Sequence, residues 1–478
     1  MAVKKNNIPG FFRFKKLKNK YLLTNDVGDF VFLPEKEFKN FTEGKAGEEK
    51  KFQELDGKNF FRTDAPSQRL IGKYRSRNFF LNERGPSLHI IVVTLRCNHQ
   101  CLYCQTSSRG PEEKGFDMSL ETAKKTVDLI FSSPNPNIAI EFQGGEPLIN
   151  WPAVKFIAEY ALQKNKKARK NLQLKLVSNF TLMDKEKMKF LFDKGVSFCT
   201  SLDGPRHIHN KNRIFLGRDN SYEKATYWIK KIYQEYNGRK RKGKNVFKPQ
   251  ALITLTRHSF AYPKEIVDEY LKWKFESIYL AQANFLGMAQ STWSRIGFQP
   301  AEYLKFYRKA VDYMIKLNMR GIYFRESGAS IKLIKILTDQ DPNFFENRSP
   351  CGAGLGQMLY NYDGAIYPCD EGRMVAGEHF RIGQAGKSKY REIINHSTVK
   401  TLCLTSCLEN TVCDICAYKP YCGVCPVLNF ALYGNPFCQT PDNVNCKINQ
   451  GIFNYLFERL ENKKIAEIFK SWAVRRTP

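Results

Sequence analysis

A chain of 478 residues is long enough for two or three domains, each with its own core. Charged residues make up 26% of it, and 76 basic against 47 acidic side chains leave a formal net charge of +29. No apolar run approaches the roughly 18 residues of a transmembrane helix, and residues 1–10 lack the apolar core of a secretory signal. The sequence therefore predicts a cytoplasmic protein without a membrane segment.

Basic residues are spread along the whole chain, with short runs at 164–170 and 239–244. Such runs are typical of solvated helix ends and loops, and no RNA-recognition or helix-turn-helix signature accompanies them. The charge suits an acidic peptide equally well. The sequence therefore does not favour nucleic acid as a partner, although an RNA-binding or RNA-modifying protein stays as an alternative.

Residues 1–85 are predicted to form a small α+β module. Two apolar runs within 21–33 flank the glycine-containing segment 25–29, and this pattern predicts a β-hairpin. Helical patterns follow at 36–41 and 48–55. A hairpin with short helices is similar to the peptide-recognition elements of enzymes that modify ribosomally made peptides, where a leader peptide adds a strand to a sheet edge. The alternative is a module that only packs on the next domain.

Strand and helix patterns alternate through residues 86–300. Repeated βα units favour parallel strands with right-handed crossovers, and six of them predict an α/β partial (β/α)6 barrel. Functional groups of such barrels gather at the carboxyl ends of the strands. The predicted strands are 88–95, 137–142, 172–177, 196–202, 248–255 and 277–284, and the predicted helices are 119–131, 152–163, 184–194, 222–236 and 262–272.

Three cysteines follow the first predicted strand in C-x3-C-x2-C order: Cys97, Cys101 and Cys104. Thiolates are soft ligands, and three on one short loop favour an iron–sulfur cluster whose fourth iron has no protein ligand. A zinc site would need a fourth ligand, which His99 is badly placed to supply, and plain packing is the other alternative. The remaining cysteines are not expected to form disulfides in a cytoplasmic protein.

Small and polar residues follow the next strands. Gly144 and Gly145 permit a close backbone approach, and Glu146 offers an acceptor for an ammonium group. Ser178 and Asn179 come after the third strand, and Ser201-Leu-Asp203 after the fourth. Loop capping is the alternative role for these polar side chains.

With Tyr103 directly before Cys104, the cysteine loop resembles the signature of the radical S-adenosylmethionine (SAM) superfamily. The resemblance implies a [4Fe–4S] cluster on the three cysteines, with SAM chelated to the fourth iron. One electron from an external donor would cleave SAM to a 5′-deoxyadenosyl radical. The segment from Gly144 to Glu146 looks like the GGEP motif that binds the SAM amino group. The resemblance also implies SAM ribose or carboxylate contacts from Ser178, Asn179 and Ser201, and a substrate-facing Asp203.

Residues 301–348 are predicted to be bridging helices, with patterns at 301–319 and 331–337, and a cysteine-rich tail starts at 349. The tail resembles the SPASM domain, the auxiliary-cluster extension of radical SAM peptide-modifying enzymes. The resemblance implies two auxiliary [4Fe–4S] clusters. One would be held by Cys351, Cys369 and Cys425, and the other by Cys413, Cys416, Cys422 and Cys446.

Several points of this tail stay open. The first auxiliary cluster lacks a fourth cysteine, which Cys403, Cys407 or no residue supplies. Cys438 is an alternative to Cys446, and a zinc ribbon is the alternative for residues 413–425. Asp370 directly follows Cys369, at the position where the similar anaerobic sulfatase-maturating enzymes have a proposed catalytic base. A capped turn is the other interpretation of this aspartate.

Residues 21–41 look most like the HxsB-type maturases of the His-Xaa-Ser peptide systems. This resemblance implies an oxidoreductase that modifies a precursor peptide, with a second maturase as a further partner. Radical SAM dehydrogenation of a small molecule or sugar is the alternative activity. The predicted divisions are a recognition-like module at 1–85, a barrel at 86–300, helices at 301–348 and a SPASM domain at 349–478.

Overall fold

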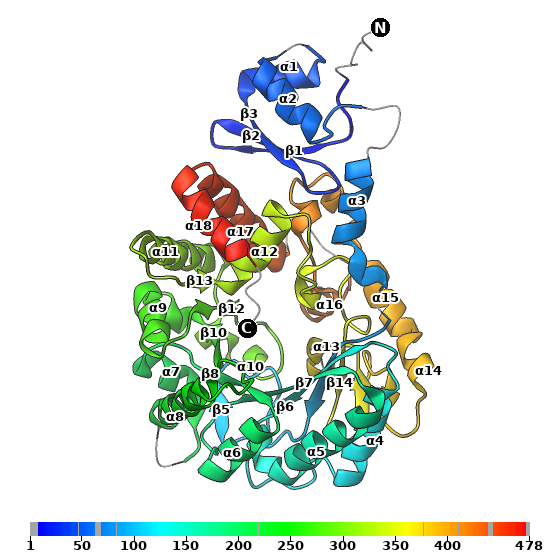
Figure 1. The fold of residues 1–478 in the computed structure, drawn as a ribbon, viewed down its shortest axis with the longest axis vertical. Helices are drawn as coiled ribbons and strands as arrows, with labels where there is room; N and C mark the ends of the chain where they lie inside the picture. Colours follow the sequence, from blue (N-terminus) through cyan, green and yellow to red (C-terminus); the bar gives the residue numbers. More distant parts are fainter. Residues whose placement is uncertain are drawn as a thin grey trace.

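The computed structural model describes residues 8–45, 47–62, 68–82, 84–217, 220–375, 377–409, 411–437 and 443–474. Its central element is a nine-stranded sheet with the order β12-β10-β8-β7-β6-β4-β14-β15-β16. This sheet and its helices fill the lower part of Figure 1. The first part of the chain forms a separate three-stranded sheet at the top.

The six predicted barrel strands are present and parallel. The sixth differs from the prediction, because it is divided into β11 (Ser277–Ile278) and β12 (Leu280–Gln282). β11 pairs with β13 (Arg325–Glu326), and the buried Glu326 carboxylate accepts the Leu280 amide at 3.0 Å. The other strands are β4 (Leu88–Val92), β6 (Asn137–Gln143), β7 (Asn171–Ser178), β8 (Val196–Ser201) and β10 (Gln250–Leu255).

The predicted helices lie between these strands along the chain. Ile140 and Phe142 of β6 join the main core with helix residues such as Ile157, whereas Glu141 between them is half-buried. Side chains cap several helices, as Asp184 does by accepting the Lys187 amide at 2.7 Å. The helices are α4 (Leu120–Phe131), α5 (Trp151–Ala168), α6 (Lys185–Asp193), α7 (Arg206–Asn212), α8 (Ser221–Arg241) and α9 (Pro263–Lys272).

The cysteine-rich segment begins by extending the barrel sheet. β14 (Gln357–Tyr360) pairs in parallel with β4, and β15 (Ala365–Tyr367) and β16 (Gly383–Gln384) continue antiparallel. Short helices carry the remaining cysteine loops. They are α13 (Asp370–Met374), α14 (Tyr390–Ile394), α15 (Ser397–Thr405), η5 (Thr411–Cys413), η6 (Lys419–Tyr421) and α16 (Pro426–Tyr433).

Two helices beyond the barrel, α11 (Pro300–Met319) and α12 (Ser327–Leu337), cover the predicted bridging patterns. They pack on the last helices, α17 (Val444–Leu460) and α18 (Lys463–Ala473), where the Tyr455 hydroxyl donates to Asp312 at 2.7 Å. α10 (Ala289–Ile296) precedes them. No described helix combines the length and apolar character that a membrane span requires.

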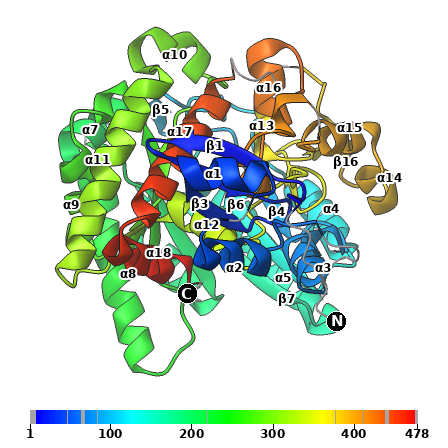
Figure 2. The ribbon, with the colours of Figure 1, turned by 90° about the horizontal axis from the view of Figure 1, so that it is seen from above.

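The N-terminal module contains the predicted hairpin, β2 (Lys20–Thr24) and β3 (Phe30–Pro34), and an additional edge strand, β1 (Arg13–Leu17). Sequence patterning misses β1 because its strand is mostly basic. Viewed from above, the module lies over the region between α11–α12 and the cysteine-rich helices (Figure 2). Its helices are α1 (Glu35–Thr42), α2 (Glu49–Gly57) and α3 (Gln68–Arg77).

The module is attached to the C-terminal segment by buried polar contacts. The Thr24 hydroxyl donates to the Ala417 carbonyl at 2.8 Å, and the Tyr421 hydroxyl donates to the Gly28 carbonyl at 3.1 Å. The Phe30 ring packs edge-on against Phe457, with ring centroids 5.2 Å apart. The module therefore does pack on the rest of the chain, which leaves a recognition role for its sheet edges as a separate question.

Candidate active site and metal centres

The loop that carries Cys97, Cys101 and Cys104 is held by backbone hydrogen bonds on both sides. Its middle strand, β5 (His99–Cys101), pairs antiparallel with β9 (Arg213–Phe215). The Cys97 amide donates to the Arg109 carbonyl, and the Leu102 amide to the Asn212 carbonyl, both at 2.9 Å. The loop is thus preorganised at the carboxyl end of β4, where a partial barrel places its chemistry.

His99 is not available as a fourth ligand. Its Nδ1 lies 3.0 Å from both Asn98 Oδ1 and Asn179 Nδ2, and its Nε2 lies 2.8 Å from Ser221 Oγ. Burial, and then the nearby Arg213 charge, lower the pKa of His99 to about 3, so the ring is neutral. The loop therefore offers three thiols, a donor set that suits a cubane with one open iron.

Gly144 and Gly145 pack on the backbone just before the cysteine loop. An added Cβ at Gly144 would lie 2.2 Å from the Thr94 carbonyl oxygen, and one at Gly145 would lie 2.3 Å from the Arg96 carbonyl oxygen. The Gly145 and Glu146 amides donate to these same two carbonyls at 2.9 and 2.8 Å. The close approach that the sequence predicts is thus made to the chain itself.

We expect Gly145→Ala to abolish cluster retention, because its methyl group would collide with backbone that cannot rotate away. Overpacking of this kind costs about 1–3 kcal/mol or more and would displace the cysteine loop. Iron content after anaerobic reconstitution measures the effect. Gly238→Ala is the matched control, since a Cβ at this position in α8 meets nothing within 4 Å. Wild-type iron content in Gly145→Ala would contradict this packing role.

Glu146, Ser178 and Asn179 form one buried network. Glu146 Oε1 accepts from the Ser178 hydroxyl at 2.7 Å and the Leu148 amide at 3.0 Å, and Oε2 accepts from the Asn179 amide at 2.8 Å. Burial raises the pKa of Glu146 to about 7 against these hydrogen bonds. A carboxylate has about four acceptor positions, so one stays free for an ammonium group. The cofactor contacts of these three residues stay predictions, and the structure adds a loop-capping role.

Asp203 does not face a substrate cavity, contrary to the sequence-based expectation. It is fully buried, and its Oδ2 accepts from the Tyr103 hydroxyl at 2.5 Å and lies 3.2 Å from Arg213 Nε. Arg213 Nη1 in turn lies 3.9 Å from Cys101 Sγ. Arg213 was missed because no short motif links β9 to the cysteine loop; only their pairing brings them together.

Ser201 remains half-buried at the end of β8, two residues after the half-buried Cys199. Burial, and then the nearby Glu141 charge, raise the pKa of Cys199 to about 12, which leaves it a neutral thiol. Among the polar residues predicted to contact SAM, Ser201 is the one whose side chain is not enclosed by the network described above. Its contact with SAM stays a prediction.

The C-terminal cysteines gather into the two predicted groups. Burial, followed by the charges of Glu371 and Cys425, raises the pKa of Cys369 well above its ordinary value, and Cys351 acts in the same direction. In the second group, burial and then Cys416 and Cys446 raise the pKa of Cys422 to about 12. Cys351 and Cys369 belong to one buried cluster against which Cys425 packs, and the cysteines of the second group line one cavity.

Helix starts support the first group. Cys369 Sγ accepts the Gly372 amide at 3.3 Å at the start of α13, and Cys425 Sγ accepts the Leu428 amide at 3.5 Å at the start of α16. Amides at helix N-termini favour the thiolate that binds metal. Cys403 lies in α15 and Cys407 in the turn after it, where the Cys407 thiol donates to the Cys403 carbonyl at 3.4 Å. Which of them, if either, is the fourth ligand of the first group stays open. Cys438 lies outside the described residues.

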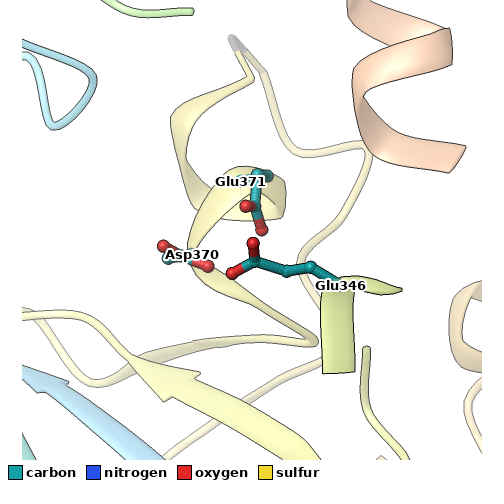
Figure 3. Close-up of side chains that lie close together, drawn as sticks. All are labelled: Glu346, Asp370 and Glu371. Atoms are coloured by element: carbon teal, nitrogen blue, oxygen red, sulfur yellow. The ribbon is translucent and has the colours of Figure 1, made fainter. Parts of the chain in front are cut away.

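Asp370 meets two further carboxylates. It begins α13, Glu371 follows it, and Glu346 approaches from η4 (Phe345–Asn347), so that oxygens of all three lie within 4.8 Å of one another. Figure 3 shows the Glu346 side chain extending toward the other two. Glu346 is exposed, Asp370 is half-buried and Glu371 is buried. Sequence analysis missed Glu346 because it belongs to no motif.

Residues 91–238 match the family model of the radical SAM superfamily. The chain contains a radical SAM domain. It is 24% identical over 402 residues to the cysteine-type anaerobic sulfatase-maturating enzyme of Clostridium perfringens, covering 79% of this chain and 97% of that one. It is 27% identical over 206 residues to the radical SAM cyclopropyl synthase TigE of Paramaledivibacter caminithermalis, covering 40% and 42%.

Solved structures show the same fold. The structure of anSMEcpe with bound AdoMet (SAM) aligns with a TM-score of 0.64 at 20% identity, over 79% of this chain and 99% of that chain. Streptococcus suis SuiB bound to precursor peptide SuiA aligns with a TM-score of 0.53 at 15% identity, over 91% and 99%. The predicted α/β radical SAM fold is confirmed, and the cysteine-rich tail is consistent with a SPASM-like domain.

Radical SAM proteins bind a [4Fe–4S] cluster and SAM, and the predicted cofactors are thereby confirmed at the level of this superfamily. The three thiols of the β4 loop fit that cluster, because His99 is fully engaged elsewhere and leaves an open iron. The two C-terminal cysteine groups fit the auxiliary clusters. The assignment of individual ligands stays a prediction.

Proposed function

We propose that the protein is a radical SAM maturase that modifies a ribosomally made precursor peptide of the His-Xaa-Ser type. The observation that carries the proposal is the N-terminal sheet, which is added to the radical SAM fold and whose β1 and β3 have no strand partner on their outer sides within the described residues. Unpaired strand edges offer main-chain hydrogen bonds to a peptide, whatever its side chains. A small substrate needs no such edge.

Aromatic side chains next to β1 support this role. Phe11 and Phe14 are 59% and 51% exposed, and the Tyr21 and Phe38 rings stack with centroids 4.0 Å apart beside Phe14. An added strand at this edge would contact Phe14 on one face, and alternate peptide side chains would pack there. Related solved structures support a peptide substrate, since anSMEcpe has been described with the Cp18Cys peptide and SuiB with SuiA.

The carboxylates Glu346, Asp370 and Glu371 give the site a chemical preference. They are acceptors and suit a histidine imidazolium or a serine hydroxyl of the precursor, in a protein that is otherwise strongly basic. Asp370, half-buried at the start of α13, is the group we assign to take up a proton from the substrate. Glu346 and Glu371 keep that proton within a shared cluster of carboxylates.

The cysteine loop of the barrel would bind the cofactors of the reaction. Cys97, Cys101 and Cys104 would hold the cluster at which SAM binds, and Glu146 and Ser201 would orient SAM. When bound and reduced by an external one-electron donor, this pair supplies the radical that takes a hydrogen atom from the substrate. Asp203 and Arg213 position the cysteine loop through their contacts with Tyr103 and Cys101. A second maturase acting on the same peptide is a proposed partner.

The test is anaerobic incubation of the reconstituted protein with SAM, dithionite and a synthetic His-Xaa-Ser precursor peptide. We expect a mass change of the peptide that accompanies 5′-deoxyadenosine formation. A peptide with the same composition in scrambled order is the control. An unmodified precursor, together with turnover of a sugar alcohol or salt-sensitive binding of RNA, would replace this proposal with the dehydrogenase or the RNA-modifying alternative.

A further inference from the structure

The four cysteines of the second C-terminal group are half-buried and line a cavity of about 210 Å³. Lys332 of α12, Tyr418 just before η6 and Gln450 of α17 line the same cavity. Cys425 of the first group and the acids Glu346 and Glu371 line it as well. These cysteines, Cys413, Cys416, Cys422 and Cys446, would together hold a cluster with four thiolate ligands. Such a cluster carries net negative charge, which a buried site must compensate.

Lys332 is a buried cation that lacks a carboxylate partner. Lys332 is 7% exposed. Its Nζ lies 3.4 Å from Asn347 Oδ1 and 5.8 Å from the centroid of the Phe453 ring. No ion pair reaches it among the described residues. Glu326, the acid with the largest effect on Lys332, already accepts three backbone amides, from Leu280 and from Gly328 and Ala329 at the start of α12.

The electrostatics of Lys332 point toward the cysteines. Burial lowers the pKa of Lys332, and Glu326 and then Cys422 act in the opposite direction. An isolated buried ammonium group is costly, and an anion in the cavity removes that cost. Lys332 is therefore placed as the counter-charge of whatever the four thiolates hold.

A second lysine, from the N-terminal module, lies near the same cysteines. Lys15 of β1 donates to Gln450 Oε1 at 3.0 Å, and Gln450 Nε2 donates to Cys446 Sγ at 3.3 Å. Lys15 Nζ also lies 5.3 Å from the Tyr418 ring centroid, next to the loop that carries Cys416 and Cys422. The N-terminal module thus contributes a charge and a hydrogen-bond relay to this site.

Arg13, two residues before Lys15, fixes the same loop. Its side chain is 2% exposed, its Nε donates to the Asp414 carbonyl at 2.5 Å, and its Nη1 donates to Asp26 at 2.7 Å. Asp414 lies between Cys413 and Cys416, so β1 is joined to the cysteine pair itself. Lys15 is accordingly held in register with the cysteines and is not a freely moving surface lysine.

We propose that Lys15 and Lys332 are the charge partners of the cluster held by Cys413, Cys416, Cys422 and Cys446, and that they raise its reduction potential. The N-terminal module is then part of an electron-transfer centre as well as a site for the peptide. The inference rests on the proposed ligand set, although it does not depend on which peptide is modified. Charges and hydrogen bonds around the sulfurs are known determinants of cluster potential.

The first C-terminal group has a different environment, which makes the proposal selective. The charged groups that act on Cys351, after its burial, are Glu371, Arg348 and Glu346. Glu371 and Glu346 also act on Cys425. Neither lysine is among the strongest influences on the thiols of Cys351, Cys369 and Cys425. Loss of either lysine is therefore expected to affect one auxiliary cluster and to leave the other unchanged.

The experiment is a potentiometric titration followed by electron paramagnetic resonance on the full chain with Cys97, Cys101 and Cys104 replaced by alanine. This background leaves only the auxiliary clusters. In it, Lys15→Met and Lys332→Met are compared with Lys16→Met. Lys16 lies in the same strand, but its side chain is 51% exposed and pairs with Glu35 at 3.4 Å.

We expect one of the two auxiliary midpoint potentials to become more negative in Lys15→Met and in Lys332→Met, and to be restored toward wild type in Lys15→Arg. Selective loss of about four irons in these variants, with Lys16→Met intact, would also support the charge partnership. Unchanged potentials at full iron content in Lys15→Met would overturn it, even if Lys332→Met fails to fold. A shift of equal size in Lys16→Met would overturn it as well. Iron content below about eight in the unsubstituted background would instead refute the ligand set.

Discussion

Replacing Cys97, Cys101 and Cys104 together by alanine is expected to lower the iron content from about twelve to about eight per chain and to abolish SAM cleavage. Three thiols leave one iron of this cluster open for SAM, because His99 is neutral and engaged at both ring nitrogens. The fold should persist, since the loop is anchored by backbone pairing with β9 and not by the sulfurs. Iron, sulfide and 5′-deoxyadenosine are the three quantities to measure.

Cys199→Ala is the matched control for this prediction. Cys199 is a half-buried free cysteine on β8, and neither cysteine group includes it. Its variant should keep about twelve irons and full SAM cleavage. About four irons in the unsubstituted protein, with zinc present, would show that the tail is a zinc module and that the auxiliary clusters do not exist. Iron unchanged in the triple variant would show that the barrel loop holds none.

Asp370→Asn is expected to leave SAM cleavage at about the wild-type rate and to lower product formation by about 100- to 10,000-fold, the usual range for loss of a general base. An amide cannot take up the proton that the carboxylate takes up. The shape of the side chain and the position of α13 should be kept. The measurement is the ratio of modified peptide to 5′-deoxyadenosine.

Glu378→Gln provides the control for loss of a carboxylate in the same segment, because Glu378 pairs with Arg381 and its side chain is 70% exposed. Glu346→Gln tests whether the proton is shared, and a partial loss of product there would indicate a common proton among the carboxylates. If Asp370→Asn forms product at the wild-type rate, another group is the base.

The barrel and the cysteine loops could be predicted from the sequence for a physical reason. Alternating strand and helix patterns are local, and parallel strands with helical crossovers follow from them. Cluster ligands on one loop must be close in the chain, so the spacing of Cys97, Cys101 and Cys104 carries its own meaning. The same holds for the Cys413 and Cys416 pair.

The sequence predicted less well which neighbours individual residues face. The buried Asp203 carboxylate contacts the Tyr103 hydroxyl of the cysteine loop and the Arg213 side chain. Arg213 reaches this position because β9 pairs with β5. Gly144 and Gly145 pack against backbone carbonyls just after β4. The GGE motif alone does not predict this contact. Both results depend on pairing between segments that a local pattern does not link.

By itself, then, the sequence determined the radical SAM class, the alternating α/β order and the cysteine sets, because each depends on residues close together in the chain. Only the tertiary structure placed Glu346 beside Asp370, joined β14 to β4, and brought Lys15 and Lys332 to the same four cysteines. These arrangements come from packing between distant segments. Burial then decides which charges need a partner, and the site acquires its chemistry from that requirement.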